Sequence, residues 1–304
     1  MQKTQTMSLF DWGLLLSLSI LWGGSFFFSK LALAELPPFT VVLARVAIAA
    51  IVLFIYLRAT RQGIPTSIGA WGAFFGMGLL NNLIPFSLLF WGQTQIASGL
   101  ASILNATTPI FAIVVAHFLT TDERMTSNKA AGIVLGFMGV ALMMASNAFS
   151  TQALPFLALF ACLAAALSYG FAGVFGRRFR RMGIAPATSA FGQTTATTIM
   201  MIPIAILVDT PWNLAIPSGT TITALVGLGL LSTALAYIIF FHILAVGGAT
   251  NVSLVTLMIP VSAILLGSLV LGETLQANHF AGMALISLGL ISIDGRVFRR
   301  LRRI

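Results

Sequence analysis

Two basic residues, Lys30 and Arg45, lie inside long apolar stretches of this 304-residue sequence, where a charged side chain is costly to bury. The guanidinium of Arg45 is planar and can hold a carboxylate through two parallel hydrogen bonds, so it is a candidate for binding an anionic ligand. Two structural interpretations stay open beside this one. The side chain could extend along its helix to reach water, or it could hydrogen-bond a carbonyl group or Gln193 and fix helix packing. Lys30 lies nearer the end of its stretch, which favours an anchor or a gate.

Polar residues and prolines occur together near the middle of other apolar stretches. Asn105 lies four positions before Pro109. In the same way Thr256 lies four positions before Pro260, and Asn82 lies three positions before a proline. A proline removes one backbone donor and leaves a carbonyl group unpaired, which a ligand or a neighbouring hydroxyl can satisfy. We expect these prolines to interrupt their helices, where they either shape packing and gating or contribute to a binding site.

Aromatic residues near the middle of the apolar stretches form a second group of candidates. Interior Tyr and Trp side chains need a hydrogen-bond partner for their polar atoms. We expect this group to line an amphipathic cavity that accepts a ligand with an apolar or aromatic body. Its members are Trp22, Phe86, Phe90, Tyr169 and Tyr237. The candidate binding site consists of these five residues together with Arg45, Asn82, Asn105, Gln193 and Thr256.

The elements that must position these residues are helices that cross a membrane. Hydrophobic residues make up 58% of the chain and charged residues 8%, and the mean hydropathy is +1.01. A water-soluble fold needs a larger polar surface than this composition provides. The apolar stretches are continuous over about 20 residues, as in transmembrane helices, and lack the alternation of a barrel strand. We predict an all-α integral membrane protein with ten transmembrane helices, near residues 12–33, 38–58, 68–91, 97–119, 127–147, 153–176, 187–208, 219–241, 247–270 and 277–294.

The sequence also contains an internal repeat. The residues Glu123, Asn128, Ala131, Gly132, Leu135 and Gly139 recur 150 positions later as Glu273, Asn278, Ala281, Gly282, Leu285 and Gly289. We therefore expect two five-helix repeats, 12–147 and 153–294, between a short tail at 1–11 and a basic tail at 295–304. Because each repeat has an odd number of helices, the second is inverted in the membrane relative to the first. Inverted repeats are typical of secondary transporters.

The basic residues predict the orientation of the chain. If the N-terminus is cytoplasmic, 14 of the 16 Lys and Arg residues fall in the tails and in the loops on that side, and the remaining two are Lys30 and Arg45. This asymmetry follows the positive-inside rule and places both termini in the cytoplasm. The net charge of +9 is therefore interpreted as a topology signal, and no nucleic-acid partner is expected.

Several motifs are similar to those of a known family. They are Trp22–Ser25 followed by Lys30, the pair Pro37 and Pro38 followed by Arg45, Asn105 with Pro109, Thr256 with Pro260, and the loop residues Glu123 and Glu273 before glycine-rich helices. Their order and duplication resemble the EamA family of the drug/metabolite transporter superfamily. The resemblance implies a ten-helix transporter of the cytoplasmic (inner) membrane, in which spans 1–4 and 6–9 surround the pathway and spans 5 and 10 pack outside it. Many members are similar to exporters of amino acids and other small metabolites.

The residues and the resemblance together predict a secondary transporter that exports small amphipathic metabolites, such as amino acids with large apolar side chains, by alternating access. None of the seven acidic residues is expected near mid-membrane, which favours facilitated diffusion or exchange over proton coupling. No nucleotide-binding motif, metal cluster or catalytic set is evident, so no cofactor, metal or enzymatic activity is expected. The alternatives are a multidrug or nucleotide-sugar-like carrier, an integral-membrane enzyme acting on lipid, or a scaffold.

The expected partners are the lipid bilayer and a small-molecule substrate. Gly132 and Gly136 form a GxxxG motif, which lets two helices approach closely. This motif is consistent with a homodimer or with packing inside one chain.

Overall fold

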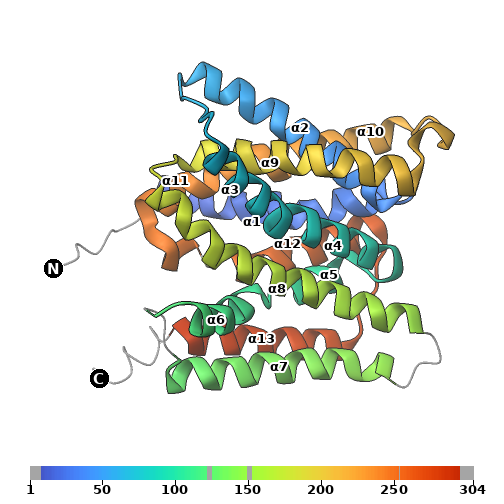
Figure 1. Cartoon of the computed structure of the whole chain (residues 1–304). Coiled ribbons are helices and arrows are strands. Elements are labelled where there is room, and N and C mark those ends of the chain that lie inside the picture. The colour runs from blue at the N-terminus through green and yellow to red at the C-terminus, as the bar shows by residue number, and fades with distance from the viewer. Residues whose placement is uncertain (1–7, 122–124, 149–152, 253, 295–304) are drawn as a thin grey trace.

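The computed structural model describes residues 8–121, 125–148, 153–252 and 254–294, and these form a bundle of helices (Figure 1). In chain order the elements are α1 (Leu9–Ala32), α2 (Pro38–Ala59), α3 (Ile68–Gly78), η1 (Leu79–Leu83), α4 (Ile84–Gln95), α5 (Ser98–Asn105), α6 (Thr108–Leu119), α7 (Ser127–Ala148), α8 (Ala153–Arg181), α9 (Pro186–Ile204), η2 (Ala205–Asp209), η3 (Pro211–Asn213), α10 (Gly219–Val226), η4 (Gly227–Leu235), α11 (Ala236–Val252), α12 (Leu254–Leu271) and α13 (Ala277–Asp294). The segments η1, η2 and η4 are π-helical, and η3 is a 3₁₀ turn.

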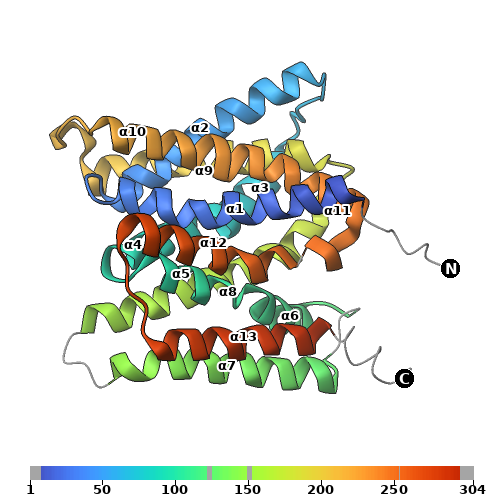
Figure 2. The same cartoon turned by 180° about the vertical axis from the view of Figure 1, so that it is seen from behind.

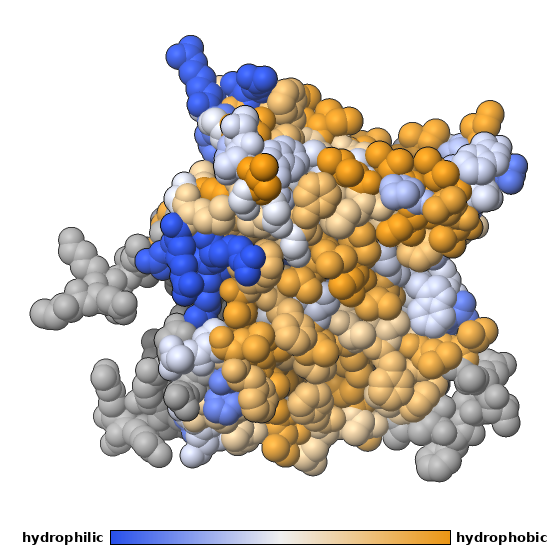
Figure 3. Space-filling view, in the orientation of Figure 1, coloured by the Kyte–Doolittle hydropathy of each residue, from blue (hydrophilic) through white to orange (hydrophobic). Residues whose placement is uncertain are grey.

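The bundle has the apolar exterior that the composition predicts. Within the described residues, eight helical segments are long and apolar enough to cross a membrane, and Val255–Leu271 and Ala277–Ile293 are shorter apolar helices. Large side chains such as Ile51, Leu207 and Leu230 point outward. Figure 3 shows a broad apolar face along the bundle, with hydrophilic residues gathered mainly at the end where α1 begins. This distribution suits a protein surrounded by lipid.

The two ends of the bundle can be told apart by the helices that begin and end there. α1 begins and α13 ends at the same end, as both views show (Figures 1 and 2). We call this the proximal end. The opposite end, which holds the short connections from α1 to α2 and from α4 to α5, is called the distal end. A chain that begins and ends on one side crosses an even number of times.

α7 and α13 form a tightly packed antiparallel pair at one side of the bundle. A Cβ atom added at Gly139 would lie 2.6 Å from the carbonyl oxygen of Gly282, and one added at Gly282 would lie 2.6 Å from that of Gly139. Gly132 and Gly289 make the corresponding contact. Residues 150 positions apart thus exchange places across the seam, as an approximate two-fold axis requires. The glycines therefore pack helices within this chain.

Two helices contain π-helical turns at positions that correspond between the halves. η1 (Leu79–Leu83) precedes Pro85, and adding 151 to its residue numbers places it inside η4 (Gly227–Leu235). A π-turn shifts the hydrogen-bond register and leaves carbonyl groups available to side chains. The Ser168 hydroxyl donates to the carbonyl of Leu80 at 2.7 Å, and the Thr233 hydroxyl donates to that of Leu228 at 2.8 Å.

The prediction that prolines interrupt their helices is confirmed at Pro109 and wrong at Pro260. α5 ends at Asn105 and α6 begins at Thr108, so the helix is broken just before Pro109. The Thr108 hydroxyl donates at 2.7 Å to the Asn105 carbonyl, which cannot receive a bond from the proline. α12 continues as a helix through Pro260, which is preceded by Ile259 and so has no hydroxyl in the corresponding position.

The expected loop at 242–246 is also corrected by the structure. α11 continues as a helix to Val252, and α12 begins at Leu254. Residues 242–246, between the two expected spans, are one histidine and four apolar residues without a glycine or a proline, so the helix has no strong local signal to end.

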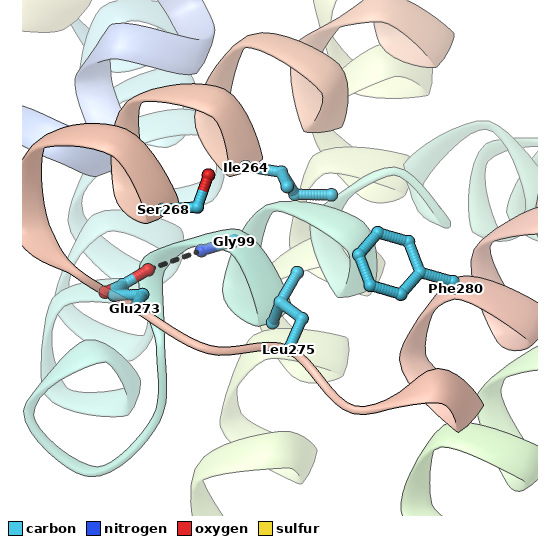
Figure 4. A pocket seen from close by; sticks show the side chains of 6 residues that line it. All are labelled: Gly99, Ile264, Ser268, Glu273, Leu275 and Phe280. Atoms are coloured by element: carbon cyan, nitrogen blue, oxygen red, sulfur yellow. Dashed lines mark hydrogen bonds between the residues drawn. The ribbon is translucent and has the colours of Figure 1, made fainter.

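At the distal end, Glu273 joins the segment between α12 and α13 to the start of α5. Its carboxylate accepts hydrogen bonds from the Ser98 backbone N–H at 2.8 Å, from the Ser98 hydroxyl at 2.7 Å and from the Gly99 backbone N–H at 3.3 Å. The last of these is drawn in Figure 4, beside a small pocket of about 90 Å³. A carboxylate at a helix N-terminus satisfies donors that lack partners in the helix. Glu123, the corresponding residue of the first half, lies outside the described residues, as does Asp122.

Two further carboxylates at the distal end also cap helices of the opposite half. Glu35 accepts bonds from the Ser218 backbone N–H at 2.7 Å and its hydroxyl at 2.6 Å, just before α10. These bonds hold the pKa of the Glu35 carboxyl below its usual value. Asp209 accepts bonds from the backbone N–H and the hydroxyl of Thr40 in α2, at 2.6 and 2.9 Å. The acidic residues of this end are thus engaged in joining the two halves.

Candidate functional site

A cavity of about 380 Å³ lies between the two halves of the bundle. It is lined by residues of α1, α2, α3, α4, α8, α9, α11 and α12, together with the π-helical turns η1 and η4 and the break between α5 and α6. Nine of the ten residues that the sequence proposed for a site lie on its wall: Trp22, Arg45, Phe86, Phe90, Asn105, Tyr169, Gln193, Tyr237 and Thr256. The structure therefore brings them together, while their part in binding stays a prediction.

Arg45 lies in the wall of this cavity and is 6% exposed, so it does not reach out to water along its helix. Its Nε donates a hydrogen bond of 2.9 Å to the Thr233 hydroxyl, rather than to a carbonyl group or to Gln193. Its guanidinium carbon lies 3.8 Å from the centre of the Phe86 ring and 5.6 Å from that of Phe90. The ring faces partly offset the loss of water around the charge.

Among the described residues, no acidic neighbour neutralises the charge of Arg45. In this part of the chain, no Asp or Glu lines the cavity. Within the described residues, no carboxylate lies within salt-bridge distance of Arg45, and its bond to Thr233 uses one of five guanidinium N–H groups. A buried cation without an anion is costly, so Arg45 is a candidate to bind a negatively charged group. The described residues contain no group of three or more His, Cys, Asp or Glu side chains that could hold a metal ion.

Gln193 and Tyr237 of the second half belong to a neutral hydrogen-bond network that also includes asparagines of the first half. The Asn81 amide donates to Gln193 Oε1 and to the Tyr237 hydroxyl oxygen, each at 3.0 Å. The Tyr237 hydroxyl donates to Asn82 Oδ1 at 3.2 Å, and the Asn82 amide donates to Thr197 Oγ1 at 3.2 Å. Asn82 is fully buried and is not part of the cavity wall, so it supports Tyr237 from behind.

Two polar atoms in the cavity wall have no partner in the structure. They are Oδ1 of Asn105, at the break between α5 and α6, and the hydroxyl oxygen of Ser232 in η4. Buried polar atoms are normally hydrogen-bonded, and leaving one unpaired costs about 1–3 kcal/mol. Both residues line the cavity, while the two unpaired atoms themselves are buried.

Aromatic rings form another part of the wall, in a pattern shared by the two halves. The Phe86 and Phe90 rings are stacked with their centres 6.3 Å apart. The rings 151 positions later, Tyr237 and Phe241, are stacked at 6.1 Å. Trp22 packs against Phe240 at 5.4 Å. These walls favour a ligand with an apolar or aromatic body.

Sequence reasoning missed several lining residues that a fuller use of the repeat would have found. Asn81, Ser232 and Thr233 were not proposed as site residues, although Asn81 and Ser232 lie 151 positions apart, as do Asn82 and Thr233. The same offset relates Asn105 to Thr256. Gln93 also lines the cavity, and its amide donates to the Phe26 carbonyl at 3.2 Å.

The three residues proposed as gates or anchors lie outside the cavity wall. The Lys30 ammonium donates to the carbonyl groups of Gln93 and Ile96 at 2.6 and 3.0 Å, so it ties α1 to the C-terminal end of α4. Pro109 follows the break in span 4, and Pro260 lies inside α12. Their gating roles stay predictions.

A bundle of apolar helices with an internal, partly aromatic cavity and one buried cation is the architecture of a membrane carrier for small solutes. The family model of the EamA-like transporter family matches residues 12–145 and 156–293, and the chain belongs to this family.

The chain is also similar to individual transporters. It is 28% identical over 91% of its length to the uncharacterized transporter YoaV of Bacillus subtilis (strain 168), of which 94% is covered. It is 27% identical over 97% of its length to a probable amino-acid metabolite efflux pump of Escherichia coli (strain K12), of which 98% is covered. A solved crystal structure aligns with a TM-score of 0.67 at 20% identity, covering 97% of this chain and 99% of that one, which supports the fold.

Proposed function

We propose that this transporter exports small amphipathic metabolites that carry a carboxylate, such as amino acids with large apolar side chains. The observation that carries the proposal is Arg45, a buried cation whose open guanidinium edge faces a cavity walled by aromatic rings. The carboxylate would bind Arg45, and the apolar body would lie between the rings. The name of the Escherichia coli relative supports export of an amino-acid metabolite.

We further propose that ten helices in two inverted repeats work by alternating access around this cavity. The exchanged glycine contacts of α7 and α13 and the matching π-turns support this arrangement. The positive-inside rule then places the proximal end, and both termini, in the cytoplasm. The distal carboxylates that join the halves would lie on the outer side of the cytoplasmic (inner) membrane.

The charge of the cavity separates this proposal from the other carriers considered. A cationic drug would meet Arg45 and no carboxylate, so its desolvation would not be offset. A nucleotide sugar carries two phosphate charges, and Arg45 is the one basic residue in the cavity wall. The same wall contains no acidic residue that could bind and release a coupling proton, which supports facilitated diffusion or exchange.

Transport by purified protein in liposomes tests the proposal. Labelled phenylalanine and leucine should cross wild-type vesicles, and Arg45→Gln should lower the flux about 10- to 100-fold, the loss expected for a charged hydrogen bond. Arg58→Gln is the matched control, because Arg58 lies on the same helix but is exposed and outside the cavity. Flux that survives Arg45→Gln would contradict the assignment of the carboxylate to Arg45.

A further inference from the structure

We infer that the cavity selects net monoanions, carboxylates that lack an ammonium group, over zwitterionic amino acids, and that each such transport cycle moves one negative charge out of the cell. The inference deepens the proposed function and rests on it. It names deaminated acids with an aromatic or branched body, such as 2-hydroxy or 2-oxo carboxylates, as the preferred substrates.

The first step is the charge inventory of the cavity. Among the described residues, Arg45 is the one charged residue in its wall. Its relative exposure to solvent is 6%. The acidic residues at the distal end, Glu35, Asp209 and Glu273, are already bonded to the N-terminal turns of helices. The described cavity therefore offers a ligand one full positive charge and no full negative charge.

The second step is the position of an amino acid's ammonium group. It is attached to the carbon next to the carboxylate, so a carboxylate on Arg45 places the ammonium near the same guanidinium. Two like charges in a low-dielectric site repel, and the ammonium would find neutral acceptors only. A hydroxyl group in the same position carries no charge, so it avoids this repulsion and costs less to transfer from water.

The third step is the charge moved in a cycle. A monoanion bound to Arg45 makes a neutral pair, and the empty carrier returns with Arg45 still positive. The net movement of a full cycle is one negative charge outward, which a negative-inside membrane potential favours. At equilibrium this potential supports a gradient of about 50-fold per 100 mV. Export therefore needs no proton-binding carboxylate, in agreement with the cavity wall.

A matched set of three compounds tests the inference in proteoliposomes that contain the full chain. 3-Phenyllactate, phenylalanine and phenylalaninol share one aromatic body and differ in carrying an anion, a zwitterion and a cation. We expect efflux of phenyllactate to exceed that of phenylalanine about 10-fold, with no flux of phenylalaninol. An inside-negative potassium diffusion potential set with valinomycin should accelerate phenyllactate efflux and leave phenylalanine efflux unchanged. Protein-free vesicles measure the passive leak of each compound, which is subtracted from its flux.

A binding measurement accompanies the flux and does not depend on turnover. In detergent, phenyllactate should raise the melting temperature of the protein more than phenylalanine does, and Arg45→Gln should remove the difference. The inference would be overturned if phenylalanine crossed at least as fast as phenyllactate, or if phenyllactate flux did not respond to the membrane potential. Either result would leave the proposed function standing. Absence of both flux and stabilisation for both carboxylates would remove the proposed function as well.

Discussion

The contact surface between α7 and α13, called the seam, is symmetric between the two halves, whereas the central cavity is not. Across the seam, Gly139 contacts Gly282 as Gly132 contacts Gly289, so each half presents the same residue type to the other. In the cavity, Arg45 of the first half and Gln193, 148 positions later in the second half, are different residues of the same wall. One corner is a cation with a single protein hydrogen bond, and the other is a neutral network.

This difference separates the demands of packing from those of binding. Two helix backbones that touch at an approximate two-fold axis need a small residue on both sides, because either side chain would strike the other's carbonyl group. A ligand with one charged end and one apolar end has no two-fold symmetry. A site that recognises such a ligand, as we propose for Arg45, therefore departs from the symmetry of the repeat.

The largest effect is expected at the seam, and it should be the same on both sides. Gly139→Ala and Gly282→Ala each place a Cβ 2.6 Å from a backbone oxygen, which must move. We expect each to lower the free energy of unfolding by about 2–3 kcal/mol, as for overpacked cores. Thermal melting in detergent checks this.

Gly13→Ala is the control for the seam, because a Cβ there meets nothing within 4 Å. It should keep or slightly raise the melting temperature, since Ala favours helix. A large loss at Gly139 with none at Gly282 would break the symmetry claimed for the seam.

A smaller effect, confined to one half, is expected in the cavity. Thr233→Val removes the hydroxyl that accepts a hydrogen bond of 2.9 Å from Arg45 Nε. We expect KM for a carboxylate to rise about 10-fold, which corresponds to a loss of about 1.4 kcal/mol of binding free energy. Thr233→Ser keeps the hydroxyl and should restore KM. Asn82→Ala changes the corresponding position of the first half.

Asn82 lies behind the wall, so its substitution should lower stability and leave KM nearly unchanged. Initial rates over a range of substrate concentrations separate KM from kcat for the three variants. Similar KM values for Thr233→Val and Asn82→Ala would show that Arg45 needs no support from Thr233.

The sequence predicted the parts of the molecule that depend on composition and spacing. Long apolar stretches are sufficient to place the helices, because an unpaired backbone is excluded from lipid. The sequence also grouped Arg45, Gln193, Phe86 and Tyr237 in one candidate site, and all four line the same cavity.

The parts that were missed depend on contacts between helices. The π-turn at Leu79–Leu83 is accompanied by a hydroxyl of α8, Ser168, which bonds the Leu80 carbonyl. No local pattern reveals that partner, so the opposite placement of Asn81 in the wall and Asn82 behind it was not foreseen. The bond from Arg45 to Thr233 likewise joins residues 188 positions apart.

The smallest effect on flux is expected when Pro109 or Pro260 is replaced by Ala. Pro109→Ala restores a backbone N–H that can continue the helix from α5 into α6, and a proline-free helix is favoured by up to about 3 kcal/mol. We expect a straightened span 4 to displace Asn105 in the cavity wall and to lower the initial flux about 3-fold. Pro260→Ala should change flux by less than about 2-fold, because α12 is already continuous there.

Thr108→Val distinguishes the proline from the hydroxyl beside it. The Thr108 hydroxyl occupies the Asn105 carbonyl at 2.7 Å, so its removal from the wild-type chain leaves that carbonyl unpaired. We expect this variant to lower flux as Pro109→Ala does, and the double variant, in which the restored N–H can reach the carbonyl, to be no worse than either. If Pro260→Ala lowered flux as much as Pro109→Ala, the break before Pro109 would have no special role. The two halves would then differ at Arg45 and not in their helix breaks.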